Sequence, residues 1–298
     1  EPLLRKDLYE LGEYAISKGI RAVISSNGTL IDEPKARRIA EVGFSYVGIS
    51  IDGGPEAHDH FRQKKGAFDA AIRGIENCAR AGVKAGVRLT VNQHNYRDLE
   101  TVLDIVEQHK IPRFCMYHLV YSGRGKDLAQ QDLTLEQTRR VAETLIEKTY
   151  DWDRRGVETE ILTTDNHADG VMLEKHIRSL NPERALEISE LQKRHGGCSA
   201  GRKFANVDWR GDVHACQFWN HVTLGNVKDR KFSEIWTDPD NEFLQKLKHL
   251  HEHVTGRRCG SCKYKTICGG CRIRAEAVCG DIWGDDPACY LSDEEIME

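Results

Sequence analysis

The chain has 298 residues, of which 39% are hydrophobic and 30% are charged, and its formal net charge is −4. This composition supplies enough apolar side chains for a folded core, and it excludes a broadly basic protein that binds nucleic acid. No apolar run approaches the roughly 18–20 residues of a membrane-spanning helix, so we expect a cytoplasmic protein with no nucleic-acid and no membrane partner. The chain begins at Glu1 without an initiator methionine, and we expect it to be part of a longer protein.

Residues 1–121 alternate between helical and strand-like patterns. Apolar residues recur at helical spacing in residues 8–16 and 68–75, and each stretch is followed by a glycine stop signal. Short and almost continuously apolar runs predict buried parallel strands at residues 20–26, 46–51, 83–91 and 113–120. A helix–strand order that repeats four times predicts an α/β fold, either a barrel or a doubly wound sheet.

Small polar residues follow the predicted strands. Asn27 follows the first strand, Ser50 lies near the end of the second, and His118 lies in the last. In both α/β architectures ligands bind at the C-terminal ends of the strands, so these residues are candidates for a site. Asn-Gly and Asp-Gly pairs are also ordinary turn formers, and that alternative stays open for each strand end taken alone.

The second half of the chain differs from the first in its predicted elements and in its composition. Residues 134–155 predict a long amphipathic helix, residues 157–162 a strand, and Asn181-Pro182 the start of another helix. From Cys198 onward the helical periodicity fades until about residue 241, and glycine, cysteine and tryptophan become more frequent. We therefore predict two domains, residues 1–190 and residues 191–298.

Eight of the ten cysteines lie between Cys198 and Cys289. Four of them form the pattern C-x2-C-x5-C-x2-C, at Cys259, Cys262, Cys268 and Cys271. Thiolates are soft ligands that select zinc, copper(I) or iron–sulfur clusters. The central spacing is short for a zinc ribbon and dense enough for cluster binding, so iron–sulfur, zinc and disulfides all remain open from spacing alone. For Cys78 and Cys115, outside this region, buried packing is the default expectation.

The cysteine pattern with its upstream Gly211 and Cys216 resembles the SPASM extension of radical S-adenosylmethionine (SAM) enzymes, which carries auxiliary 4Fe–4S clusters. The α/β repeat before it resembles that family's partial (β/α)6 barrel, here lacking its first strands. Glu1-Pro2 resembles the end of the family's Gly-Gly-Glu-Pro motif. The family's C-x3-C-x2-C triplet, which binds the catalytic cluster, does not occur in these residues. The resemblance therefore implies that this fragment is inactive alone in radical chemistry.

The resemblance also implies a SAM-binding site. Glu1 is similar to the acid that receives the SAM ammonium group, a charge-assisted hydrogen bond. Ser50 is similar to a serine that contacts SAM, and Arg62 to the arginine that pairs with the SAM carboxylate. Asn27 is a further candidate for the cofactor-binding set. The alternative for Arg62 and Glu1 is an exposed loop residue and an ordinary terminal residue.

By the same resemblance the cysteines divide into two ligand sets. The outer auxiliary cluster would be held by Cys259, Cys262, Cys268 and Cys289. The inner one would be held by Cys198, Cys216 and Cys271, with Cys279, His195 or the substrate as the fourth ligand. The chain departs from the family in two respects: the spacing before the last tandem cysteine, Cys271, is one residue shorter, and an upstream cysteine is absent. Cys279 can therefore equally be a structural or free thiol rather than a ligand.

Within the family, four segments are most similar to enzymes that remove side chains from siroheme derivatives: residues 117–125, 164–170, 217–227 and 286–291. This likeness implies an enzyme of tetrapyrrole (heme) biosynthesis that removes acetate groups from 12,18-didecarboxysiroheme through a 5′-deoxyadenosyl radical. Propionate removal in d1-heme biosynthesis and a SPASM peptide maturase are the alternatives. The implied partners are the iron-tetrapyrrole substrate and a low-potential electron donor such as ferredoxin or flavodoxin.

Such a substrate carries several carboxylates, so cationic residues at the barrel mouth are candidates for substrate binding. Arg124 and Lys126 follow the fourth predicted strand, where a solvated loop is the alternative. His118 and His167 are catalytic candidates that would ligate iron, bond a carboxylate or move a proton, against the alternative of a structural histidine. Asp165 and Asp169 are expected to cap or turn the chain. A non-enzymatic zinc-ribbon interaction protein is the remaining hypothesis.

Overall fold

The computed structural model describes residues 1–297, with the side chains of Arg124 and His195 left out. Contacts divide the chain into two compact units. The first consists of residues 1–118 and 143–164, and the second of residues 119–142 and the chain from 165 onward. The domain boundary predicted near residue 190 falls within the second unit, so the predicted domains and the compact units differ.

The first unit contains a five-stranded parallel sheet in the order β1-β2-β3-β4-β5. Its strands are β1 (Ile24–Ser26), β2 (Val47–Ser50), β3 (Ala85–Thr90), β4 (Arg113–Tyr117) and β5 (Glu160–Thr164). Because neighbours in the sheet are also neighbours in the chain, the topology is that of a partial barrel, and the predicted α/β fold class is confirmed.

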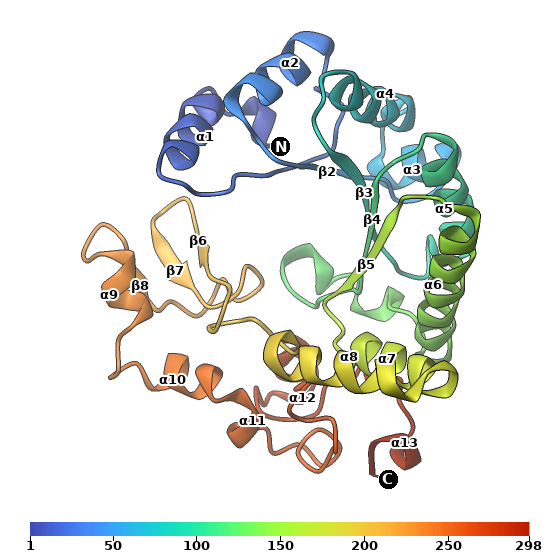
Figure 1. Cartoon of the computed structure of the whole chain (residues 1–298). Coiled ribbons are helices and arrows are strands. Elements are labelled where there is room, and N and C mark those ends of the chain that lie inside the picture. The colour runs from blue at the N-terminus through green and yellow to red at the C-terminus, as the bar shows by residue number, and fades with distance from the viewer. Residues whose placement is uncertain (298) are drawn as a thin grey trace. The chain divides into compact units, whose positions relative to one another are not determined.

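Helices connect these strands and lie along one side of them (Figure 1). They are α1 (Leu8–Ser17), α2 (Glu33–Val42), α3 (Pro55–Arg62), α4 (Ala67–Arg80), α5 (Leu99–Gln108) and α6 (Leu135–Arg155), together with the short 3₁₀ turns η1 (Pro2–Leu4) and η2 (Tyr96–Asp98). Local signals set their ends: the Asp32 side chain accepts from Lys35 N at the start of α2, and Gly43 ends that helix at φ 91°. Phe68, Ala71 and Ile75 form the buried face of α4, as their spacing predicts.

The two faces of the parallel sheet differ in chemistry. On one face lie fully buried apolar side chains, among them Val47, Ile49, Val87, Leu89, Phe114 and Met116. The strand register places mostly small and polar residues on the other, namely Ser25, Gly48, Ser50, Gly86, Arg88, Arg113, Tyr117 and Glu160, together with Cys115 and Leu162. The continuous apolar pattern that the sequence suggested is therefore an alternation, and we call this second surface the polar face of the sheet.

The second unit begins with two short turns, η3 (Gly123–Gly125) and η4 (Ala129–Gln131), and two helices, α7 (Ala168–Leu180) and α8 (Pro182–His195). A small antiparallel sheet follows, formed by β6 (Asn206–Val207), β7 (Asp212–His214) and β8 (Gly225–Asn226). The remaining helices are α9 (Phe232–Trp236), α10 (Glu242–Lys248), α11 (Leu250–His253), α12 (Arg272–Cys279) and α13 (Asp293–Met297). Its core packs Trp219, Ile235, Leu244 and Leu247 together with Cys198 and Cys271.

Within residues 1–297, no helix combines the length and the apolar character that crossing a membrane would require.

Candidate functional site

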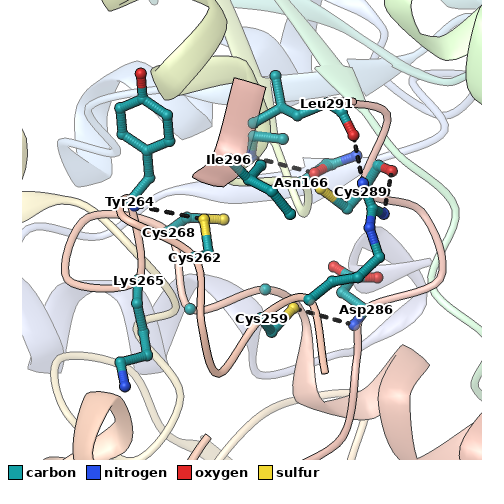
Figure 2. A pocket seen from close by; sticks show the side chains of 14 residues that line it. Asn166, Cys259, Cys262, Tyr264, Lys265, Cys268, Asp286, Cys289, Leu291 and Ile296 are labelled. Carbon is teal, nitrogen blue, oxygen red and sulfur yellow. Dashed lines mark hydrogen bonds between the residues drawn. The ribbon is translucent and has the colours of Figure 1, made fainter. Parts of the chain in front are cut away.

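One cavity of the second unit is lined by four cysteines, Cys259, Cys262, Cys268 and Cys289 (Figure 2). The cavity is small, about 20 Å³, and it is open in part to solvent. The structure thus brings together the four residues predicted as the outer ligand set, which we call the outer cysteines. Among the side chains that the structure describes, which leave out His195, no group of three or more His, Cys, Asp or Glu is arranged to hold a single metal ion.

Backbone amides point at the sulfurs of the outer cysteines. Tyr264 N donates to the Cys262 sulfur at 3.4 Å, and the amides of Gly270 and Leu291 donate to Cys268 and Cys289. In each case the donor lies two residues after the cysteine. Hydrogen bonds of this kind favour the charged thiolate and fix the direction of the sulfur.

Burial acts on the same thiols in the opposite direction. It raises the pKa of Cys289 to about 11, raises the pKa values of Cys259 and Cys262, and raises that of Cys268 well above its ordinary value. In the absence of a ligand these thiols therefore hold their protons at neutral pH. A soft cation or cluster that binds them must displace the protons, which couples loading to pH.

A buried arginine, Arg272, lies next to one of the outer cysteines, and its surroundings bear on whether these cysteines fit an anionic cluster. Arg272 is 0% exposed, and its Nη1 donates to the carbonyls of Ile282 at 3.0 Å and Gly284 at 2.6 Å. Its Nη2 lies 4.0 Å from the Cys259 sulfur, its Nε has no partner, and no described carboxylate pairs with it. A buried cation without a counter-charge is costly. Four thiols, one of them 4.0 Å from such a cation, fit an iron–sulfur cluster, whose thiolates would supply the missing negative charge.

Three cysteines of the predicted inner set lie together in the core of the second unit. Cys198 and Cys271 are buried, and Cys216 packs against the same core. Burial, with added repulsion from the neighbouring thiols, raises the pKa of Cys198 to about 11 and that of Cys216 to about 12. The Asp165 carboxylate also raises the pKa values of all three thiols. Asp165 therefore lies near this set, a position that its expected role in a turn does not reveal.

The structure does not bring Cys279 to these three cysteines. Cys271 caps the start of α12 and Cys279 is the last residue of that helix. Eight residues of α-helix span about 12 Å. The Cys279 thiol is exposed and donates to the Asp285 carbonyl at 3.7 Å.

Three of the four SAM candidates lie at one edge of the parallel sheet. The Glu1 carboxylate accepts from Ser26 Oγ at 2.8 Å and from Asn27 N at 2.9 Å. Ser26 pairs with Ile49 in the register, so Asn27 and Ser50 occupy the next positions along the neighbouring strands β1 and β2. The Asn27 side chain accepts from Thr29 N and Oγ1, so it also forms the expected turn.

The fourth candidate, Arg62, ends α3 and is anchored by a carboxylate. Its Nε donates to Asp52 Oδ2 at 2.5 Å, and the Asp52 side chain is buried. The same aspartate donates from its backbone N to His58 Nδ1 at 3.0 Å, and burial lowers the pKa of that histidine. Asp52, two residues beyond the Ser50 end of β2, therefore holds the Arg62 guanidinium, with His58 on its other side.

The two histidine candidates and Arg124 lie in three different segments of the chain. His118 is buried after β4 and donates from its backbone N to Thr164 O at 3.1 Å. His167 is the N-cap residue of α7. Arg124 belongs to η3, but its side chain lies outside the described part of the structure.

Lys126 lines a cleft of the second unit with Tyr121, Phe218, His221 and Glu276. Glu276 accepts from Trp219 Nε1 at 2.6 Å and contacts His221 Nε2 at 2.9 Å. Trp219 is fully buried in the core of the second unit, whereas Phe218 lines the cleft.

Comparison with known proteins identifies the family. A model described as the radical SAM superfamily matches residues 1–106, and SPASM, an iron-sulfur cluster-binding domain, matches residues 198–272. Fe-coproporphyrin III synthase of Methanosarcina barkeri is 50% identical over 299 residues, which cover 99% of this chain and 75% of that protein. The chain belongs to the radical SAM family. Its two matched domains imply SAM and iron–sulfur clusters as cofactors, and the predicted family is confirmed.

Two other relatives in the radical SAM family carry different names. Pre-heme d1 synthase of Dinoroseobacter shibae is 39% identical, over 99% of this chain and 73% of that protein. The mycofactocin maturase MftC of Mycobacterium tuberculosis is 31% identical, over 99% of this chain and 70% of that protein.

Solved structures confirm the fold of this radical SAM chain. Streptococcus suis SuiB bound to precursor peptide SuiA matches with a TM-score of 0.73 at 18% identity, over 98% of this chain. The match spans 64% of the SuiB chain, so this chain covers just under two thirds of its length. Native anSMEcpe with bound AdoMet matches with a TM-score of 0.70 at 20% identity, over 98% of this chain and 76% of that one.

Sequence reasoning missed the buried charges around the cysteines. Arg272 and Arg274 follow the last cysteine of the tandem pattern, and Asp286 opens the segment that ends in Cys289. The only available signal was charged residues directly beside cysteines, in a region otherwise rich in glycine. Their burial and mutual contacts arise from chain folding that no local pattern encodes.

Proposed function

We propose that this chain belongs to a radical SAM enzyme that removes acetate side chains from 12,18-didecarboxysiroheme in tetrapyrrole biosynthesis. The observation that carries the proposal is the 50% identity, over 99% of the chain, to a protein named Fe-coproporphyrin III synthase. That name gives an iron-tetrapyrrole product, which is compatible with acetate removal from an iron-tetrapyrrole and does not by itself select that step.

The cofactors are assigned to the residues described above. SAM would be held by Glu1, Asn27, Ser50 and Arg62, the outer auxiliary cluster by the outer cysteines, and the inner cluster by Cys198, Cys216 and Cys271. Cys279 stays a candidate fourth inner ligand by resemblance, although the structure sets it apart. When bound, SAM together with a reduced catalytic cluster would supply a 5′-deoxyadenosyl radical for hydrogen removal from the substrate side chain. The C-x3-C-x2-C triplet of that catalytic cluster is not among these 298 residues, so we expect this segment alone to be inactive.

The cleft around Lys126 is our candidate for part of the substrate site. The Lys126 ammonium would pair with a substrate carboxylate, and Tyr121 and Phe218 offer ring surface to a flat macrocycle. Arg124 is proposed as a second carboxylate-binding residue, and His118 and His167 as iron ligands or proton carriers. A low-potential ferredoxin or flavodoxin is the proposed electron donor.

Two alternative functions have specific support. The 39% identity to pre-heme d1 synthase favours propionate removal as the second candidate. The 31% identity to a mycofactocin maturase, together with the fold shared with a peptide-bound SuiB, favours peptide modification as the third.

The test uses the full-length protein with its clusters reconstituted anaerobically. It is incubated with SAM, a reductant and 12,18-didecarboxysiroheme, and the products are analysed by mass spectrometry. Loss of acetate groups with formation of 5′-deoxyadenosine supports the proposal. Loss of propionate groups would establish the d1-type reaction instead. Failure to bind or change any iron-tetrapyrrole, with modification of a precursor peptide, would reject the proposal in favour of a maturase.

A further inference from the structure

Two arginines lie across the polar face of the parallel sheet, each over a tyrosine ring. The Arg88 guanidinium carbon lies 4.6 Å from the centre of the Tyr117 ring, and that of Arg113 lies 4.9 Å from the centre of the Tyr46 ring. The register pairs Arg88 with Cys115, two residues after Arg113, so both arginines project from the same face. The sheet therefore carries two cation–π contacts of the same kind on the same face.

A glycine in a neighbouring strand gives Arg88 its room. A Cβ atom at Gly48 of β2 would lie 2.5 Å from Arg88 Cδ, closer than any real contact. The missing side chain lets the arginine lie along the sheet, where its Nη1 donates to Ser25 Oγ of β1. Arg88 of β3 is thus held between Ser25 of β1 and Tyr117 of β4.

The two arginines differ in their counter-charge. Arg113 pairs with Glu160, with 2.6 Å between Nη2 and Oε2, and Lys84 Nζ lies 3.3 Å from the same oxygen. The two partners of Arg88 named above are neutral, because burial raises the pKa of Tyr117 far above neutrality and Ser25 carries no charge. No carboxylate among residues 1–297 pairs with Arg88. A half-buried guanidinium that is positioned but not neutralised is a ready site for an anion.

We propose that Arg88 is a substrate-binding residue that takes a carboxylate of the tetrapyrrole through its guanidinium fork. Its place in the sheet supports this assignment, because Arg88 is the register partner of Ser50, one of the proposed SAM residues. A carboxylate held there would place the macrocycle beside the cofactor. The inference rests on the proposed function for the identity of the anion, whereas the unpaired charge is a property of the fold.

The test compares Arg88→Gln with Arg113→Gln in the full-length, cluster-loaded protein. Dissociation constants for Fe-coproporphyrin III are measured anaerobically from the Soret band, and those for SAM by equilibrium dialysis. Loss of a charged hydrogen-bonded pair corresponds to roughly a 10–100-fold weaker affinity, and we expect Arg88→Gln to weaken Fe-coproporphyrin III binding by that factor. Arg113→Gln should bind it as the wild type does, because Arg113 is already neutralised by Glu160.

A second probe separates charge from shape. The tetramethyl ester of Fe-coproporphyrin III keeps the macrocycle and lacks its carboxylates, so the wild type and Arg88→Gln should bind it equally. Arg88→Lys should recover part of the lost affinity for the free acid, because the charge is kept and the fork is lost. Iron content and the thermal midpoint of each variant show that it is folded and loaded.

The outcomes distinguish this inference from the proposed function. If the wild type and a folded Arg88→Gln variant bind Fe-coproporphyrin III with the same affinity, only the Arg88 assignment is overturned. Loss of SAM affinity in that variant, with unchanged Fe-coproporphyrin III affinity, also overturns it and makes Arg88 a cofactor residue. Absence of tetrapyrrole binding by the wild type rejects the proposed function and, with it, the assigned ligand of Arg88.

Discussion

Arg274 and Asp286 form a bidentate ion pair in the interior of the second unit. Nε and Nη2 of the arginine donate to Oδ1 and Oδ2 of the aspartate, both at 2.8 Å, and the two side chains are 0% and 2% exposed. Burial acts to raise the pKa of Asp286, but the charge and hydrogen bonds of the Arg274 guanidinium outweigh it and lower that pKa to about 2. Asp286 also reaches both cysteine sets, because it accepts from Cys271 N at 2.7 Å and donates from its own N to the Cys259 sulfur at 3.4 Å.

Removing the charge of Asp286 should destabilise the chain strongly. Breaking a buried pair leaves an uncompensated charge at a cost of roughly 3–5 kcal/mol, so Asp286→Asn should lower the free energy of unfolding by about that amount. Asp293→Asn is the matched control, because Asp293 pairs with Arg258 but is 73% exposed; its loss should cost less than about 1 kcal/mol. Urea denaturation measures both, and equal effects of the two variants would contradict the assignment.

The predicted outer ligands should differ from Cys279 in their effect on iron content. Cys259→Ala removes a residue that lines the cysteine cavity, so we expect the loss of one cluster, about four irons per chain. Cys279→Ala should leave the iron content unchanged, since that thiol lies at the far end of α12 from Cys271. Iron and sulfide analysis of the reconstituted full-length variants measures the difference. An iron loss in Cys279→Ala as large as in Cys259→Ala would restore Cys279 as a cluster ligand.

Glu295 should make stability depend on acid pH. Hydrogen bonds from Arg139 and Lys175 hold the pKa of this carboxyl well below its ordinary value. A carboxyl with a depressed pKa stabilises the fold above its unfolded-state pKa, and that contribution is lost as the pH falls toward the folded-state pKa. The difference in unfolding free energy between wild type and Glu295→Gln should therefore be largest at about pH 6 and shrink toward about pH 3. A difference that stays constant over this range would show that the charge of Glu295 is not responsible.

Arg62 should contribute to SAM binding in the full-length protein. Arg62→Gln removes a charged donor for the SAM carboxylate, and we expect roughly 10–100-fold weaker SAM affinity. Arg38→Gln is a control of the same chemistry, because Arg38 pairs with Glu13 in an exposed ion pair. Equilibrium dialysis with SAM, alongside iron content, measures the effect. Unchanged SAM affinity in a folded Arg62→Gln variant would remove Arg62 from the cofactor site.

The sequence predicts the α/β repeat well, because each buried strand corresponds to a local apolar run such as residues 46–51. The first strand is shorter than predicted, since its pairing with β2 starts only at Ile24 and Val47. Helix α7 was not predicted, because polar Asp169 and Gly170 in its first turn read as a loop. That turn is instead stabilised through space: the Tyr290 hydroxyl donates to Asp169 Oδ1 at 2.8 Å.

The candidate site also has features that the sequence predicts and features that only the structure shows. The tandem spacing of the cysteines predicts the outer set that the structure brings together, because short loops keep nearby thiols close. Spacing does not show that a helix carries Cys279 away from Cys271. Likewise, nothing local shows that Arg274 meets Asp286, or that Arg88 stays unpaired while Arg113 does not. Those relationships depend on which segments the folded chain brings together.

The amides that point at the sulfurs of Cys262, Cys268 and Cys289 belong to the main chain. Every residue type except proline supplies such a donor, so Tyr264 and Leu291 can change without loss of these hydrogen bonds. A one-residue insertion or deletion in these turns removes the donor from its sulfur. The loops between the cysteines are therefore constrained in length far more than in residue type, and diverging relatives should tolerate substitutions there while rejecting gaps.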